Sequence, residues 1–178
     1  MRVAILVVSD RVSQGEMIDK NAQIVKRLMG QIGGTIEVES IVPDEVDLIK
    51  NELLKLCEAQ FDVVITCGGT GVSPRDVTPE ATMNVIEKRL YGMEMAMMLE
   101  AMKHTPTAVL SRAVVGVRKE TLIINLPGSP NAVEQNLKAI LPAIPHGLEK
   151  IKGSTKDCHQ EVKRLEVSQT GEFGSGLF

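Results

Sequence analysis

Three glycines in close succession make residues 66–80 the most informative segment of the sequence. Gly68, Gly69 and Gly71 follow the apolar run Phe61–Cys67, and Thr78-Pro79-Glu80 then has the pattern of a helix start, with Thr78 as N-cap. Glycines let a backbone approach a ligand closely and turn successive N–H groups toward a phosphate, and a helix start adds partial positive charge. The segment therefore predicts an anion cradle. The segment lacks the Gly-Lys-Ser/Thr of a Walker A loop and the glycine spacing of a dinucleotide-binding fingerprint. The alternative to an anion cradle is a glycine-rich turn that binds no ligand.

Three carboxylates are predicted near this cradle: Asp44, Asp76 and Glu80. Protein sites hold Mg²⁺ with one or two carboxylates plus substrate phosphates and water, so Asp44 and Asp76 are candidate ligands of an ion that accompanies a nucleoside triphosphate. Purely structural roles compete with this interpretation. Asp44 stands where the N-cap of the next helix belongs, Asp76 stands in a turn, and Glu80 complements a helix dipole.

A second glycine turn and three arginines extend the candidate site. The segment 126–131, Leu-Pro-Gly-Ser-Pro-Asn, again leads from a strand pattern into a helix start, which indicates a second anion site or a plain connecting turn. Arg11, Arg75 and Arg112 lie in short polar segments and are suited to forked contacts with phosphate oxygens, although each alone is typical of a solvated surface. No histidine stands where a serine or cysteine nucleophile needs a base, so a hydrolytic triad is not expected.

The hydrophobic pattern predicts the elements that bring these residues together. The first half alternates strands and helices: strand 3–8, helix 20–30 begun by Asp19, strand 36–42, a helix after Asp44 with an apolar face, and strand 61–67. This order is typical of a parallel sheet with right-handed crossovers, whose ligands gather at the carboxyl ends of the strands. Those ends are Ser9-Asp10-Arg11, Val42-Pro43-Asp44 and Cys67-Gly68-Gly69, and we expect them to converge.

The second half predicts one reversed strand. The strand patterns 113–117 and 122–126 are joined by so short a link that they must pair antiparallel. A last long helix opens at Ser129 and runs to about Ile151, with Pro142 and Pro145 expected to kink or break it. The methionine-rich helix 92–103 indicates packing against the core or an oligomer partner, or an adaptable binding surface.

Composition limits the class of protein. The 178 residues are 43% hydrophobic with a net charge of −3, which indicates one globular domain and argues against a broad nucleic-acid-binding face. We expect an α/β domain over residues 1–152, a three-layer α-β-α sandwich whose sheet is mostly parallel with one antiparallel strand, and a mobile polar tail over 153–178. The odd cysteine count and the absence of a signal or membrane segment favour reduced thiols and a cytoplasmic location.

These motifs together resemble the molybdopterin-binding fold. From about Arg2 to Gly153, and most closely in its opening residues, the chain is similar to the molybdopterin adenylyltransferase branch of that family, which is related to the small domain of gephyrin. The resemblance lies in Ser9-Asp10-Arg11, Ser13, Gly15 and Asp19, in Gly68-Gly69-Thr70-Gly71 followed by 75–81, in Ser111-Arg112-Ala113 and in Leu126-Pro127-Gly128-Ser129-Pro130.

The resemblance implies an enzyme of molybdenum cofactor biosynthesis that transfers AMP from Mg-ATP to the terminal phosphate of molybdopterin and releases pyrophosphate. It assigns Mg²⁺ to Asp44 and Asp76, nucleotide contacts to the Gly68–Gly71 loop, and the pterin and phosphate side to Ser111 and the turn Pro127-Gly128-Ser129. Taken with the residue patterns, it places substrate contacts at Ser9, Asp10, Arg11, Gly68, Gly69, Thr70, Gly71, Ser73, Arg75, Glu80, Ser111, Arg112, Pro127, Gly128 and Ser129.

The family also implies a homotrimer, and the molybdenum insertase of the same pathway is an expected partner. Three alternatives stay open at this point: a relative that binds molybdopterin but serves another step or a tungsten pathway, a non-catalytic trimeric scaffold, and a generic phosphate-binding domain identified by fold analogy alone.

Overall fold

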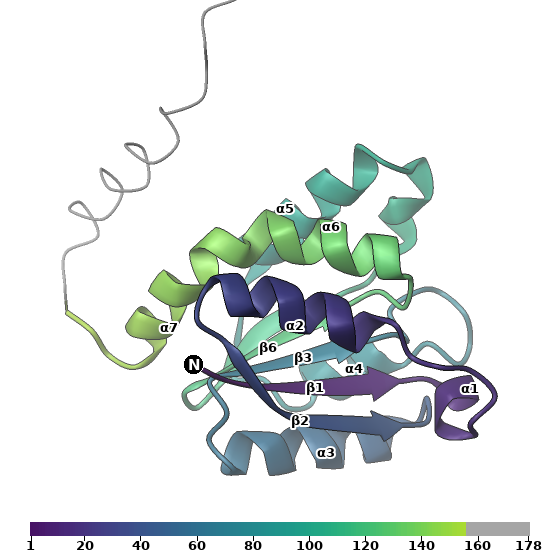
Figure 1. Ribbon diagram of the computed structural model, residues 1–178, viewed down its shortest axis with the longest axis horizontal. Coiled ribbons are helices and arrows are strands. Elements are labelled where there is room, and N and C mark those ends of the chain that lie inside the picture. Colours follow the sequence, from purple (N-terminus) through teal and green to yellow (C-terminus); the bar gives the residue numbers. More distant parts are fainter. Residues whose placement is uncertain (156–178) are drawn as a thin grey trace, which may run out of the picture.

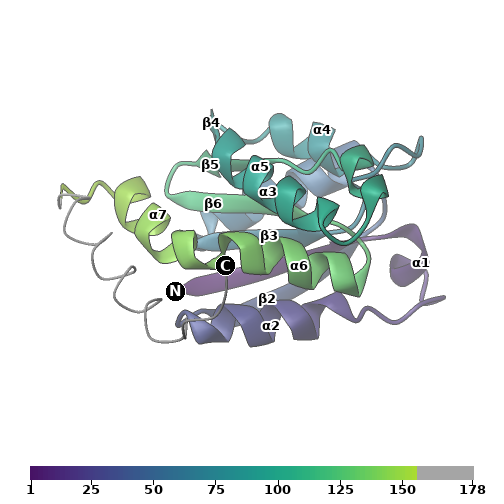
Figure 2. The same ribbon diagram turned by 90° about the horizontal axis from the view of Figure 1, so that it is seen from above.

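The computed structural model describes residues 1–155, which form one twisted sheet between two layers of helices (Figures 1 and 2). This confirms the predicted three-layer α/β sandwich. Within this part of the chain no helix is both long and apolar enough to cross a membrane. The predicted tail lies almost entirely outside the described residues, so the domain boundary at residue 152 stays a prediction.

The sheet has six strands in the order β2-β1-β3-β6-β5-β4. Neighbours from β2 to β6 run parallel, whereas β5 is antiparallel to both β6 and β4, so the predicted single reversal is confirmed. The strands are β1 (Arg2–Val8), β2 (Thr35–Val42), β3 (Val63–Cys67), β4 (Lys88–Arg89), β5 (Val115–Arg118) and β6 (Thr121–Leu126).

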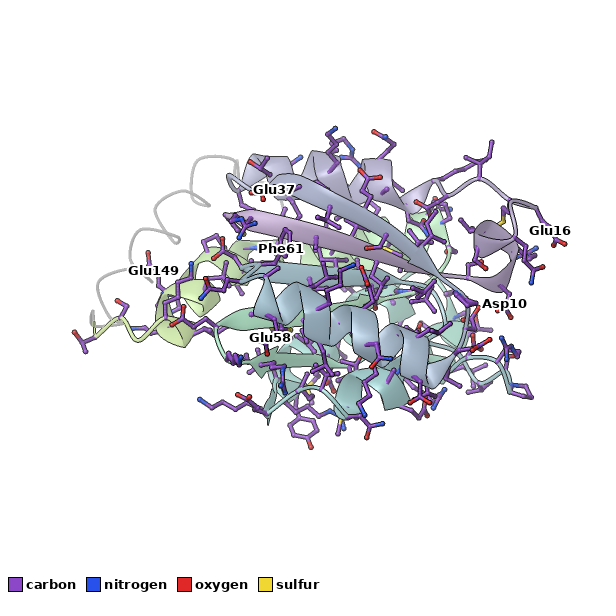
Figure 3. All side chains as sticks on the ribbon, turned by 90° about the horizontal axis from the view of Figure 1, so that it is seen from below. Asp10, Glu16, Glu37, Glu58, Phe61 and Glu149 are labelled. Atoms are coloured by element: carbon purple, nitrogen blue, oxygen red, sulfur yellow. The ribbon has the colours of Figure 1, made fainter. Side chains whose placement is uncertain are left out.

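The central strands are apolar throughout because helices cover both of their faces. Every residue of β3 and β6 is buried, and β1 is buried from Val3 onward. Along β1, Ile5 contributes to one hydrophobic core and Leu6 to the other, as the two-residue period of a strand requires. The edge strand β2 instead alternates between half-buried and exposed residues, and its exposed Glu37 disfavours pairing with the edge of another sheet (Figure 3).

Helices α2, α5, α6 and α7 cover one face of the sheet, and α3 and α4 cover the other (Figure 1). A one-turn helix, α1, follows β1 directly, and two 3-10 helices, η1 and η2, follow α5 and α6. The bounds are α1 (Asp10–Ser13), α2 (Asn21–Gln31), α3 (Val46–Glu58), α4 (Thr78–Met83), α5 (Tyr91–Met102), η1 (Pro106–Leu110), α6 (Pro130–Ile140), η2 (Leu141–Ala143) and α7 (Ile144–Ile151).

Local chemistry sets the ends of the two helices beside the site. The Ser129 hydroxyl is the N-cap of α6 and accepts the Ala132 N–H at 3.3 Å, so α6 begins as predicted. The N-cap of α2 is Lys20 and not the predicted Asp19, although the Asp19 carboxylate accepts the Ala22 N–H in the first turn at 2.8 Å. Pro142, which cannot donate a backbone hydrogen bond, falls in η2 between α6 and α7, and the expected break is confirmed.

Candidate active site

The carboxyl ends of the four parallel strands lie together at one rim of the sheet. Asp10 marks this rim in Figure 3, and Phe61 marks the opposite end. The Ser9 N–H donates to the Val42 carbonyl at 3.0 Å, and the Gly68 N–H donates to the Leu126 carbonyl at 3.0 Å. The predicted convergence of these junctions is confirmed.

The glycine loop after β3 adopts a backbone that side chains would obstruct. Gly68 has a φ of +111°, and a Cβ there would lie 2.2 Å from the Val8 carbonyl oxygen. The Thr78 hydroxyl donates to the Gly68 carbonyl at 2.9 Å, and α4 has Val77 as its N-cap, so the predicted capping role of Thr78 is wrong. Within residues 1–155, the N–H groups of Gly69, Thr70 and Gly71 donate to no protein acceptor. These three donors are therefore available to an anion.

The turn after β6 packs directly against the glycine loop. A Cβ on Gly128 would lie 3.6 Å from the Gly68 Cα. The Asn21 amide nitrogen donates to the Gly128 carbonyl at 2.9 Å and ties the start of α2 to this turn. Asn21 is not among the site residues predicted from the sequence. Its place two residues after Asp19, at the rim end of α2, is the only sequence feature that suggests a role at the site.

Asp44 and Asp10 exchange hydrogen bonds between the ends of β2 and β1. The Asp10 N–H donates to Asp44 Oδ2 at 2.9 Å, and the Asp44 N–H donates to Asp10 Oδ1 at 3.1 Å. The N-cap of α3 is Glu45, so a capping role for Asp44 in that helix is wrong. Burial raises the pKa of Asp44 above its ordinary value; the hydrogen bond from Asp10 opposes this rise, and the charges of Asp10 and Asp76 add to it.

Both predicted metal ligands border the glycine loop. A Cβ on Gly69 would lie 2.8 Å from Asp44 Oδ1, and a Cβ on Gly71 would lie 2.9 Å from Asp76 Oδ2. That Asp76 oxygen also accepts the Ser73 N–H at 2.8 Å. Among the described residues, no group of three or more His, Cys, Asp or Glu side chains is arranged to hold a metal alone. Two carboxylates beside free N–H donors are suited to a phosphate ligand with its Mg²⁺ ion: the carboxylates would bind the ion and the N–H groups would bind the phosphates. A cation at this place would also lower the pKa of Asp44.

The three predicted phosphate-binding arginines have different surroundings. Arg75 donates to both carboxylate oxygens of Asp10, at 3.0 and 2.9 Å, and this pairing lowers the pKa of Asp10. Arg112 donates to backbone carbonyls of the glycine loop and pairs with Glu80. The Arg11 side chain has no hydrogen-bond or ion-pair partner within residues 1–155, so it alone of the three is uncommitted.

Two cavities meet at this rim, and they divide the predicted site residues between them. The α1 cavity, about 760 Å³, contains Ser9, Asp10, Arg11, Asp44, Gly68 and Ser73 in its lining. The α5 cavity, about 970 Å³, contains Thr70, Gly71, Ser111, Arg112 and Pro127 in its lining together with methionines of α5. Both are lined by Gly69, Asp76, Gly128 and Ser129, which we call the shared wall. Arg75 and Glu80 line neither cavity but pair with Asp10 and Arg112, which do.

Comparison with known proteins gives consistent matches. The family described as the probable molybdopterin binding domain matches residues 4–146. The molybdopterin adenylyltransferase of Helicobacter pylori J99 is 41% identical over 164 residues, covering 90% of this chain and 93% of the relative. Gephyrin of Dictyostelium discoideum is 39% identical, but although the match covers 94% of this chain, it spans only 25% of gephyrin.

A solved structure agrees with both the sequence matches and the fold. The molybdopterin biosynthesis enzyme MoaB of Thermus thermophilus superposes with a TM-score of 0.79 at 40% identity, covering 86% of this chain and 97% of that one. The match to the family spans β1 to the first turn of α7 and so includes the whole rim and both cavities. The chain therefore belongs to the family of probable molybdopterin binding domains.

Proposed function

We propose that this chain transfers AMP from ATP to the terminal phosphate of molybdopterin, forming adenylyl-molybdopterin and pyrophosphate. The observation that carries the proposal is the shared wall, where two cavities border one glycine loop and Asp76. Transfer between two substrates requires that the attacking and leaving oxygens meet in line at one place. Two adjoining cavities with anion-binding groups between them meet this requirement.

The α1 cavity is suited to the nucleotide. Arg11 and Lys20 line it, and neither side chain has a protein partner within residues 1–155. Together with the free N–H groups of the glycine loop, they provide the positive charge that a triphosphate requires. Asp44 and Asp76 would hold Mg²⁺ against the phosphates, and the ion would neutralise charge that develops during transfer.

The α5 cavity is suited to molybdopterin. Its lining combines methionines of α5, such as Met95 and Met98, with the polar Ser111 and the turn at Pro127. Methionine side chains are polarizable and adapt to flat or sulfur-containing ligands. In this orientation the pterin lies along α5, and its phosphate reaches the shared wall.

The chemistry requires little covalent participation by the protein. A terminal phosphate oxygen of molybdopterin attacks the α-phosphorus of ATP, the bond to the β-phosphate oxygen breaks, and pyrophosphate leaves with that electron pair. Because a phosphate monoester has a second pKa of about 6, the nucleophile is already ionised near neutral pH and needs no general base. Asp44 and Asp76 therefore act as metal ligands, while the loop N–H groups and Arg11 orient the phosphates.

Product analysis tests the proposal. The protein is mixed with molybdopterin, ATP and Mg²⁺, and we expect adenylyl-molybdopterin with an equal amount of pyrophosphate. Asp44→Asn and Asp76→Asn should each lose most of the transfer yet retain molybdopterin binding, whereas Glu58→Gln, at the far end of the sheet in Figure 3, should behave as the wild type. Molybdopterin binding without any adenylyl product would instead indicate another step, a tungsten pathway or a scaffold.

We also propose that the protein is a homotrimer assembled through α5 and η1. Their exposed face is apolar and includes Tyr91, 65% exposed, Met95, 63%, Leu99, 57%, Val109, 56%, and Leu110, 51%. Exposed apolar side chains gathered on neighbouring elements are typical of a protein interface. Tyr91, Met95, Leu99 and Leu110 also line the α5 cavity, so the proposed interface adjoins the proposed molybdopterin site. The molybdenum insertase is the proposed recipient of the product. The proposed location is the cytoplasm, which the unpaired buried thiols Cys57 and Cys67 support.

A further inference from the structure

Arg112, which follows η1, is hydrogen-bonded to the segment 70–80 through each of its three guanidinium nitrogens and through its backbone N–H. Its Nε donates to the Gly71 carbonyl at 2.7 Å, and one terminal nitrogen donates to the Asp76 carbonyl at 2.7 Å. The other terminal nitrogen pairs with Glu80, and the Arg112 backbone N–H donates to the Thr70 carbonyl at 2.8 Å. Four groups of the segment 70–80 are thus held by one residue.

These contacts leave Arg112 poorly suited to bind a phosphate. Three of its five guanidinium N–H groups donate to protein acceptors, one from each nitrogen, which fixes the orientation of the fork, and the Glu80 carboxylate offsets its charge. Arg11, by contrast, lines the α1 cavity with no side-chain partner within residues 1–155. The two arginines therefore have different roles: Arg11 is free to bind substrate, whereas Arg112 holds the segment 70–80 in place.

The contacts of Arg112 fix the groups that the proposed reaction uses. Because a peptide unit is planar and trans, holding the Thr70 carbonyl toward Arg112 turns the Gly71 N–H the opposite way. That N–H is one of the three unpartnered donors of the loop. The bond to the Asp76 carbonyl fixes the backbone from which the Asp76 carboxylate extends, and that carboxylate in turn accepts the Ser73 N–H at 2.8 Å.

We infer that Arg112 is a positioning residue, which sets the Gly71 N–H and the Asp76 carboxylate at the shared wall through its protein contacts and does not act by binding a phosphate. This inference rests on the proposed adenylyl transfer. Lysine cannot substitute for it, because a single ammonium group does not present the planar fork that reaches both carbonyls and Glu80 at once. Glu80 has a supporting role, since it orients the fork by pairing with one of its ends.

The first test is Arg112→Lys, which keeps the charge and removes the fork. A misplacement of about 1 Å costs roughly 100-fold in rate, so we expect kcat to fall by about that factor and the Mg²⁺ concentration for half-maximal rate to rise. The KM values for ATP and molybdopterin should change by less than about threefold, because binding contacts are retained. If Arg112 contacts a phosphate instead, KM rises at an unchanged Mg²⁺ requirement, and the inference is wrong.

A rescue experiment excludes a merely structural effect. Arg112→Ala should regain part of its kcat when a low, non-denaturing concentration of guanidinium is added, whereas sodium chloride at equal ionic strength should not restore it. Arg118→Lys is the matched control, since Arg118 also donates to a backbone carbonyl, that of Val85 at 3.1 Å, but lines neither cavity. Its kcat and Mg²⁺ requirement should equal those of the wild type. Absence of guanidinium rescue in a folded Arg112→Ala protein would overturn the inference.

Amide hydrogen exchange makes the inference testable apart from the reaction. Arg112→Lys should raise the exchange rates of amides within 70–77, while those in β1 and β6 remain unchanged. Glu80→Gln, which retains both carbonyl contacts, should show a smaller increase. A wild-type protein without adenylyl transfer would refute the proposed function and with it the role in catalysis. An active wild type whose loop exchange and Mg²⁺ requirement are insensitive to Arg112→Lys would refute the positioning role alone.

Discussion

Replacing Gly68 by alanine tests how strictly the glycine loop depends on its backbone. Two costs are separable in the structure. A φ of +111° is one that alanine rarely adopts, and left-handed backbone costs an L-residue roughly 1–2 kcal/mol. The new Cβ would also lie 2.2 Å from the Val8 carbonyl oxygen, and relieving such an overlap costs about 1–3 kcal/mol because β1 or the loop must shift.

Two other glycines isolate these costs. Gly33 has a φ of +76° with nothing within 4 Å of a Cβ, so Gly33→Ala should show only the backbone cost, about 1–2 kcal/mol. Gly30 lies in α2 with open space at its Cβ, so Gly30→Ala should stabilise the protein by about 0.5–1 kcal/mol. We therefore expect the stability order Gly30→Ala, wild type, Gly33→Ala, Gly68→Ala.

Urea unfolding followed by circular dichroism measures this order as the free energy of unfolding. In a domain of this size each kcal/mol lowers Tm by about 2–4 °C, so the summed cost of about 2–5 kcal/mol should make Gly68→Ala melt roughly 4–20 °C below the wild type. Adenylyl transfer should fall with it, whereas Gly33→Ala should retain full transfer at temperatures where it is folded. A Gly68→Ala protein as stable as Gly33→Ala would show that the contact with Val8 does not constrain the loop, and the reasoning would fail.

Three further outcomes follow from the structure. Because the pKa of Asp44 in the folded protein lies above its ordinary 3.8, the free energy of unfolding falls as pH rises through that raised pKa. Asp44→Asn should therefore be at least as stable as the wild type near neutral pH, and the difference should shrink as urea titrations are repeated toward about pH 4. Lower stability of the variant at neutral pH would contradict this cause. Thr78→Val removes the buried hydrogen bond to the Gly68 carbonyl and should cost about 1–3 kcal/mol in urea unfolding, whereas no loss would mean that this bond does not support the loop. Leu99→Glu should reduce the mass measured by size-exclusion chromatography with light scattering from that of a trimer to that of a monomer. The control Met83→Glu, on the other face of the sheet, should leave the mass unchanged. A Leu99→Glu protein that is still a trimer would exclude α5 from the interface.

Much of the fold was predictable because its signals are local. β1 is a continuous apolar run because both of its faces are buried, and α3 has apolar residues at helical spacing because one of its faces is buried. The alternation of such strands and helices along the chain predicts a parallel sheet. The two-residue strand β4 and the one-turn helix α1 were missed, since elements this short are held by tertiary contacts and have no periodicity of their own.

The site was predictable in location but not in its contacts. Glycine turns and polar strand ends identified the rim, because the topology of parallel sheets brings strand ends together. The contacts join distant segments: Asp44 pairs with Asp10, 34 positions away, and Arg112 reaches Gly71, 41 positions away. For that reason the local capping patterns of Asp44 and Thr78 gave wrong predictions, and the backbone contacts of Arg112 had no local signal.

The close contact between Gly68 and Gly128 has a consequence for protein engineering. A Cβ added to Gly128 would lie in ordinary van der Waals contact with the Gly68 Cα, at 3.6 Å, so alanine fits there but a longer side chain must find room beside the glycine loop. In a library, Gly68 must therefore stay fixed because a Cβ there would meet the Val8 carbonyl oxygen at 2.2 Å, whereas the size allowed at Gly128 depends on the backbone of the glycine loop. Retargeting this scaffold to new substrates calls for co-varying the glycine loop and the turn after β6, or for importing them as a matched pair from one homologous donor.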